Sequence, residues 1–206
     1  MADRRHGHPA PPTDTEIFHE DWDGHDLTGQ RHSRVAFLDV DMTEVTNTGS
    51  VFDECTFRHV AFNASTHTDA AFTNCTFTSC SFFDATFHRC KMLGSMFSRC
   101  TYGVLKVDGG DWSFVGLPGA KLSSASFQDV RMREADLTGA AFEGARLLRV
   151  DLSGSWLHGA KMSGCDLRGS DLSTLDPVST EIHRAVIDVD QAVVVAGAVG
   201  FDVRPL

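Results

Sequence analysis

Large apolar residues recur at every fifth position along most of this 206-residue chain. The series begins at Trp22 and runs to Ile187, and no insertion or deletion shifts its phase. The members that are not large and apolar are His32, Asn47, His67 and Pro177. Neither the 3.6-residue period of an α-helix nor the two-residue period of a strand matches a spacing of five. The chain is therefore predicted to have a backbone that turns regularly, once in every five residues.

A small residue stands two places before the large one in most of these pentapeptides. These residues are Ser50, Cys55, Ser65, Ala70, Cys75, Cys80, Ala85, Cys90, Ser95, Cys100, Ala120, Ala125, Ala135, Ala140, Ala145, Ala160 and Cys165. Stacked repeats bury one face of each unit against the next, which builds a continuous core. We expect the large residue of each pentapeptide to point inward and the small residue to fill the space beside it.

Two stretches carry a recognisable motif: Ala-Asp-Leu-Thr-Gly at residues 135–139 and Cys-Asp-Leu-Arg-Gly at residues 165–169. They resemble the motif of the pentapeptide-repeat family, which is roughly Ala-Asp/Asn-Leu-x-x. The resemblance implies an all-β fold, a right-handed quadrilateral β-helix with four pentapeptides in each coil. We assign residues 20–187 to this β-helix and expect no long loops in it.

The two ends of the chain have other compositions. Residues 1–19 are polar and rich in His and Pro, so we predict a disordered N-terminal tail. Residues 188–203 are apolar and predict a helix, for which Asp188 or Asp190 can cap the N-terminal amides. We assign residues 188–206 to this short C-terminal α-helix and to dimerisation, because one coil end cannot cover so much apolar surface. The predicted dimerisation residues are Val189, Ala192, Val193, Val195, Ala196, Val199 and Phe201.

Six cysteines and ten histidines raise the question of metal or thiol chemistry. All six cysteines stand at small inward positions, which favours a packing role, since free Cys behaves as a small hydrophobe. Cys55 with Cys75, and Cys80 with Cys100, are close enough for disulfides, which a reducing cytosol disfavours. We expect His32 and His67 to be core histidines or sites of local distortion.

No motif indicates catalysis or metal binding. The chain has no CxxC or HExxH spacing, no glycine-rich phosphate loop, and no evident nucleophile and base pair. We therefore predict that the protein is not an enzyme, and that it holds no cofactor and no metal.

The formal net charge of −10 disfavours direct binding to nucleic acid or to an anionic membrane, and favours a basic protein partner. The most acidic face is centred on Trp22 and its equivalents twenty residues apart, and we call it the Trp22 face. Its predicted partner-binding residues are Asp21, Asp23, Asp41, Glu44, Asp84, Glu143 and Glu181; its basic residues are Lys121, Lys161 and Arg184. Two interpretations stay open: outward Asp that simply follows the repeat motif, and an acidic ladder that binds a partner.

Neither a secretory signal nor a membrane span is predicted. The first residues lack an apolar segment, and the longest apolar run, near residues 192–199, is too short to cross a bilayer. We expect the protein in the cytoplasm.

Three strings, at residues 90–97, 166–169 and 189–193, resemble the MfpA/Qnr-type fluoroquinolone-resistance proteins of the family. This resemblance implies a homodimer joined at its C-termini that mimics B-DNA and binds DNA gyrase, through one or both of the two kinds of gyrase subunit. It further implies that the protein inhibits this type II topoisomerase or protects it from drugs. The sequence departs from that pattern in a mid-rod cluster of Arg131, Arg133, Arg146 and Arg149.

Two alternatives remain. The chain could be an interaction scaffold with an unrelated protein partner, or a self-resistance factor against a natural-product inhibitor of gyrase. A supercoiling assay separates the first alternative from gyrase binding, and a neighbouring biosynthetic gene cluster would favour the second.

Overall fold

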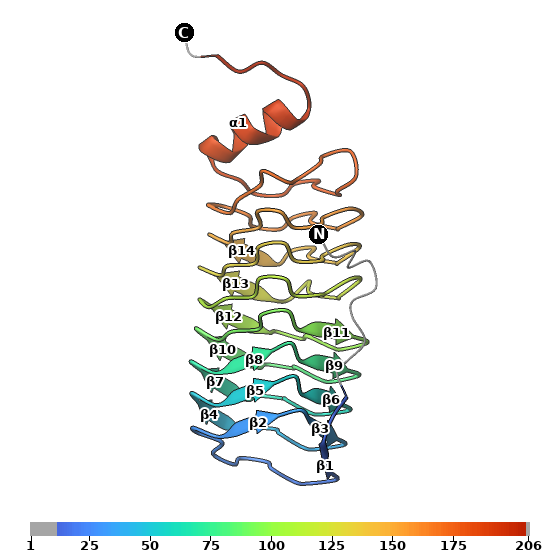
Figure 1. The fold of residues 1–206 in the computed structure, drawn as a ribbon. Coiled ribbons are helices and arrows are strands. Elements are labelled where there is room, and N and C mark those ends of the chain that lie inside the picture. The colour runs from blue at the N-terminus through green and yellow to red at the C-terminus, as the bar shows by residue number, and fades with distance from the viewer. Residues whose placement is uncertain (1–11, 205–206) are drawn as a thin grey trace.

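The computed structural model describes residues 12–204, which form a straight coil closed at its C-terminal end by one helix (Figure 1). Each turn of the coil takes 20 residues. In the first parallel pair Ile17 is in register with Phe37, and later pairs keep the same offset, as between Phe127 and Leu147. The predicted right-handed quadrilateral β-helix with a short C-terminal α-helix is confirmed.

Three of the four faces carry a parallel sheet, and each is named here by its first inward residue. The Ile17 face holds β1 (Thr15–Phe18), β3 (Val35–Leu38), β6 (Thr56–Arg58), β9 (Thr76–Thr78) and β11 (Met96–Ser98). The Leu27 face holds β4 (Thr46–Thr48), β7 (Thr66–Thr68), β10 (Thr86–His88), β12 (Lys106–Asp108), β13 (Ser126–Gln128) and β14 (Arg146–Leu148). The His32 face holds β2 (Arg31–Ser33), β5 (Val51–Asp53) and β8 (Ala71–Thr73). On the Trp22 face, isolated bridges join the coils, for example between Asp21 and Asp41.

The second residue of a pentapeptide influences whether it forms a strand or a turn. Several strands begin with β-branched threonine, which favours extended backbone: Thr46, Thr56, Thr66, Thr76 and Thr86. Aspartate at this position instead accepts a hydrogen bond from the backbone N–H two residues later, which closes a local turn. The aspartates that do so, at 2.8–3.4 Å, are Asp21, Asp26, Asp41, Asp111, Asp136, Asp151, Asp166, Asp171 and Asp176.

The inward residues form the predicted core. Phe57 and Phe77 are fully buried, and their ring centroids lie 4.8 Å apart with the rings tilted by 6°. Small residues beside them also bond to the coil before: the Ser95 hydroxyl donates to the carbonyl of Phe72 at 2.8 Å. The packing role predicted for the cysteines is confirmed, because all six are free, five are buried and Cys100 is half-buried.

His67 is a polar inclusion in this apolar core. Its ring is 1% exposed, with Nδ1 3.0 Å from the Asn47 side-chain amide and Nε2 3.0 Å from the Ser65 hydroxyl. Burial lowers the pKa of His67 to about 3, so the ring is neutral at physiological pH. His32 is half-buried and stacks on Phe52. Both are therefore core histidines, one of the two predicted possibilities.

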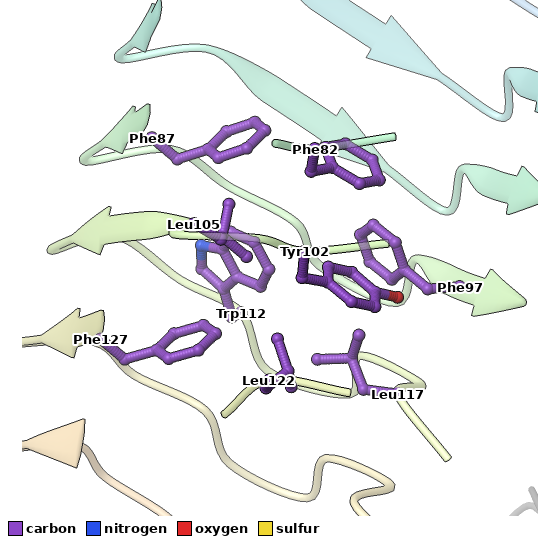
Figure 2. Close-up of a pocket in the computed structure, with 9 residues that line it drawn as sticks. All are labelled: Phe82, Phe87, Phe97, Tyr102, Leu105, Trp112, Leu117, Leu122 and Phe127. Atoms are coloured by element: carbon purple, nitrogen blue, oxygen red, sulfur yellow. The ribbon is translucent and has the colours of Figure 1, made fainter. Parts of the chain in front are cut away.

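The core changes character around Trp112, where rings from earlier coils meet aliphatic residues of later ones (Figure 2). The Trp112 ring packs edge-on against Phe87 and Phe127, and the apolar side chains around it leave no room for a water molecule. Its indole N–H has no hydrogen-bond partner among the described residues. Gly110, with φ of 97°, allows the coils to approach, because a Cβ there would overlap the carbonyl oxygen of Cys90.

The N-terminal boundary differs from the prediction. Strand β1 (Thr15–Phe18) belongs to the coil, so the predicted disordered tail of residues 1–19 is too long; residues 1–11 lie outside the described part. Ile17 stands five residues before Trp22 and packs against the core, so the five-residue series begins one repeat earlier.

The C-terminal helix α1 (Val189–Ala198) is shorter than the predicted span of residues 188–203. Asp188 is the N-cap, as predicted for one of two candidates, and it forms a capping box with Gln191. Residues 199–204 continue without regular secondary structure, and Gly200 has a φ of 95°.

Candidate interaction surfaces

The predicted acidic residues of the Trp22 face divide into three groups along the rod. Asp21, Asp23, Asp41 and Glu44 are exposed within the first two coils and have no ion-pair partner among the described residues. Asp84, in the middle, accepts a 2.7 Å bond from the Lys106 ammonium. The remaining two, Glu143 and Glu181, lie where the face also carries Lys121, Lys161 and Arg184. The structure therefore gathers the unpaired carboxylates mainly at the N-terminal end.

Other faces hold aspartates that are neutralised by arginines of neighbouring coils. Arg89 donates two hydrogen bonds to Asp69, and Arg149 donates two to Asp129, in each case across one coil. Hydrogen bonding to the guanidinium lowers the pKa of the Asp69 carboxyl. These exposed pairs add little stability each. In the early coils the carboxylates of the Trp22 face have no such partner, and neither do Glu16 and Glu54 on other faces.

The mid-rod arginines singled out in the sequence do not form a free basic patch. Arg131 pairs with Asp111, Arg133 with Asp151, and Arg149 with Asp129. The fourth, Arg146, lies on β14 and is exposed. Sequence patterning missed this because each partner is 18 or 20 residues away, a spacing that becomes a contact only in the coil.

The middle of the Trp22 face carries an apolar feature that the sequence analysis did not single out. Phe83 is 57% exposed, and Val104 of the next coil is exposed too. Gly103 makes room for the ring, because a Cβ there would lie 2.9 Å from it. The two exposed apolar residues were visible in the sequence as outward positions occupied by Phe and Val.

Helix α1 is fixed to the last coil by polar contacts that the sequence analysis also missed. The side-chain amide of Gln191, which is buried, donates to the carbonyls of Leu167 and Ser170 at 2.7 Å. The Asp188 carboxylate accepts a bond from the Gly169 N–H at 2.9 Å. The residue Val195 adds an apolar contact with the core.

The predicted dimerisation residues mostly face outward. Val195 and Ala196 are half-buried, whereas Val189, Ala192, Val193, Val199 and Phe201 are exposed. Further exposed valines in the C-terminal part of the chain are Val178, Val186, Val194 and Val203. One face of the helix thus caps the rod, while several valines at this end of the chain remain exposed among the described residues.

Among residues 12–204, no group of three or more His, Cys, Asp or Glu side chains is arranged to hold a metal ion. Within the same range, no helix has both the length and the apolar character needed to cross a membrane.

Comparison with family models gives two matches. The model of pentapeptide repeats matches residues 117–139 and 135–173, and the model of the SV2A/B/C luminal domain matches residues 24–102. No curated protein sequence matches significantly.

One solved structure superposes on nearly the whole chain. A trypsin-treated variant of QnrB1, a plasmid-mediated fluoroquinolone resistance protein, superposes with a TM-score of 0.61 at 15% identity. The match covers 94% of this chain and 97% of that one. HetL, a pentapeptide-repeat protein from the cyanobacterium Nostoc, matches 85% of this chain at 17% identity, with a TM-score of 0.28.

These comparisons agree with the repeat read along the chain. The family model matches the coils of the C-terminal half, and the QnrB1 match shows the fold over nearly the full length. Together with the 20-residue coil and its inward series, they show that the chain has the fold of the pentapeptide-repeat proteins, and that residues 117–173 match the repeats of that family.

Proposed function

We propose that this protein binds DNA gyrase through the surface of its rod and thereby inhibits the enzyme or protects it from fluoroquinolones. The single observation that carries the proposal is the distribution of charge. The coil pairs many aspartates of other faces with arginines, yet it leaves Asp21, Asp23, Asp41 and Glu44 unpaired together. A surface that normally holds DNA is basic, and such a cluster complements it.

The fold supports the same proposal. QnrB1, whose coil superposes on this one, is a fluoroquinolone resistance protein. In this proposal the chain acts by binding, without catalysis or a cofactor, in the cytoplasm, and contacts neither nucleic acid nor membrane directly. The net charge of −10 is consistent with a basic partner.

A supercoiling assay with purified gyrase, with and without a fluoroquinolone, tests the proposal. We expect the protein to slow supercoiling or to reduce drug-stabilised DNA cleavage, and we expect the effect to weaken as salt is raised. Absence of both effects would overturn gyrase binding and favour a scaffold with an unrelated partner.

Charge reversal tests the acidic cluster. Asp23→Lys with Glu44→Lys removes two unpaired carboxylates of the Trp22 face that make no side-chain hydrogen bond among the described residues. The matched control, Glu16→Lys with Glu54→Lys, changes the net charge equally on other sides of the same early coils. We expect the first pair to abolish the gyrase effect and the control to retain most of it. Equal loss from both variants would show that total charge alone matters.

The C-terminal end supports a homodimer as part of this proposal. Exposed apolar surface on the helix and the segment after it favours cover by a second copy, since the two ends would be related by a two-fold axis. Val193→Asp with Val199→Asp is expected to give monomers in light scattering, with an unchanged circular dichroism spectrum. A wild-type protein that is monomeric at micromolar concentration would contradict the dimer.

A further inference from the structure

A notch opens on the Ile17 face where Gly116 interrupts a column of outward side chains. The column runs from Met96 through Gly116 and Asp136 to Trp156, each bridged to the next coil. The Met96 methyl takes up the place that a Cβ of Gly116 would occupy, and both residues line the notch. Phe114 and Glu134 complete the walls of the notch.

Two carboxylates of the notch lack a cation. Asp136 is 8% exposed, and its Oδ1 accepts the Thr138 N–H at 3.0 Å, while no basic group pairs with it among residues 12–204. Glu134 is exposed and likewise makes no ion pair in that range. This differs from the neighbouring coil positions, where Arg131 and Arg133 pair with Asp111 and Asp151.

An aromatic ring lies next to these carboxylates. Trp156 follows Asp136 in the column and is 41% exposed, although tryptophan is usually well covered. A cation over the face of an indole is attracted by its quadrupole, and arginine is the side chain that best combines stacking with bonds to carboxylates. Apolar walls, an accessible indole and two carboxylates therefore match a guanidinium group rather than a phosphate or a lipid.

We propose that this notch receives an arginine side chain presented by a protein partner. Its guanidinium stacks on Trp156 and donates hydrogen bonds to Asp136 and Glu134. The inference goes beyond the proposed function, because it assigns a contact on the Ile17 face, away from the acidic cluster, and does not require the partner to be gyrase. The proposal is carried by the Asp136 and Glu134 carboxylates, which have no cation partner among the described residues, and by the exposed Trp156 beside them.

Fluorine NMR of the full chain labelled with 5-fluorotryptophan tests the proposal with a defined probe. The sequence contains three tryptophans, Trp22, Trp112 and Trp156, so the resonance of Trp156 is assigned by its loss in Trp156→Phe. Acetyl-arginine methylamide is titrated in, and acetyl-citrulline methylamide serves as the neutral control of nearly the same shape. We expect a saturable shift of the Trp156 resonance with the arginine compound and none with citrulline.

Variants of the two carboxylates test whether the arginine compound binds in the notch. Asp136→Asn keeps the acceptor for Thr138 and removes the charge, and Glu134→Gln is an exposed change that the fold tolerates; each is expected to diminish the shift. Asp26→Asn is the matched control, because Asp26 makes the same turn bond to Thr28 on another face. The proposal is overturned if citrulline shifts the resonance equally, if Trp22 responds as strongly as Trp156, or if the shift survives both carboxylate variants.

Discussion

The coils before Trp112 and the coils after it share one backbone but differ in their cores. Between residues 35 and 102 the inward positions are mainly phenylalanine, stacked ring on ring, as for Phe77 and Phe97 at 4.6 Å. We call this the aromatic half. Between residues 113 and 175 the inward positions are mainly leucine, as at Leu137 and Leu152, and we call this the leucine half.

The two halves also differ in how they turn. In the aromatic half three faces carry strands, whereas in the leucine half strands continue on the Leu27 face alone, in β13 and β14. Aspartate turns such as that of Asp151 replace the others. The 20-residue offset is nonetheless the same in both. The five-residue period therefore sets the fold. Whether the inward residue is aromatic or aliphatic, and whether a pentapeptide forms a strand or a turn, does not change the coil.

The largest loss of stability is expected from a charged side chain in the core of either half. Phe87→Asp in the aromatic half and Leu137→Asp in the leucine half each bury a carboxylate that has no partner, so both variants should be unfolded or insoluble. Thr78→Asp, at an outward position of β9, should fold. Thermal unfolding followed by circular dichroism measures this. Similar melting temperatures for Phe87→Asp and Thr78→Asp would contradict the inward register.

A smaller loss of stability should distinguish the aromatic half from the leucine half. Phe77→Ala is expected to cost about 3–5 kcal/mol and Leu137→Ala about 2–5 kcal/mol of the free energy of unfolding. Phe77 stacks on Phe57 and Phe97 at once, and aromatic pairs add about 1 kcal/mol beyond buried area. The aromatic variant should therefore be the less stable in urea unfolding. Equal losses would show that ring stacking contributes nothing beyond apolar burial.

The smallest expected effect is pH dependence that originates in the aromatic half. Burial lowers the pKa of His67 to about 3, whereas the unfolded chain binds the proton at about 6.5. The unfolded state thus holds more protons between these values, and stability falls as pH falls below about 6.5. The loss from this residue at pH 5 should be about 2 kcal/mol. In His67→Phe this part of the pH dependence should vanish, which unfolding curves at pH 7 and pH 5 would measure; an unchanged slope would contradict it.

Much of the fold was predictable because the signal is local and repeated. The inward series places Phe87 and Leu137 in the core. The position two residues before each large residue holds a small residue, which explains the burial of cysteines such as Cys75. The first strand was not predicted, because the residues around Ile17 are mostly polar, although Ile17 itself stands on the five-residue series.

The candidate surfaces were predictable only in part. The acidic residues of the Trp22 face and the valines of the C-terminal end were identified from the sequence. In the structure most of them are exposed, as expected for outward and terminal positions. The ion-pair partners of Asp84 and of the arginines were not predictable, because they lie 18 to 22 residues away in neighbouring coils and the side-chain geometry decides which charges meet.

The sequence by itself determined the coil, because a five-residue period of large and small residues fits no other regular backbone. It also determined the local turns at residues such as Asp171, whose side chain acts two residues away. Only the tertiary structure decided which charges remain free, how Gln191 holds the helix, and that a notch lies beside Trp156. Those outcomes depend on side chains in neighbouring coils competing for the same space and the same hydrogen bonds, which no single repeat contains.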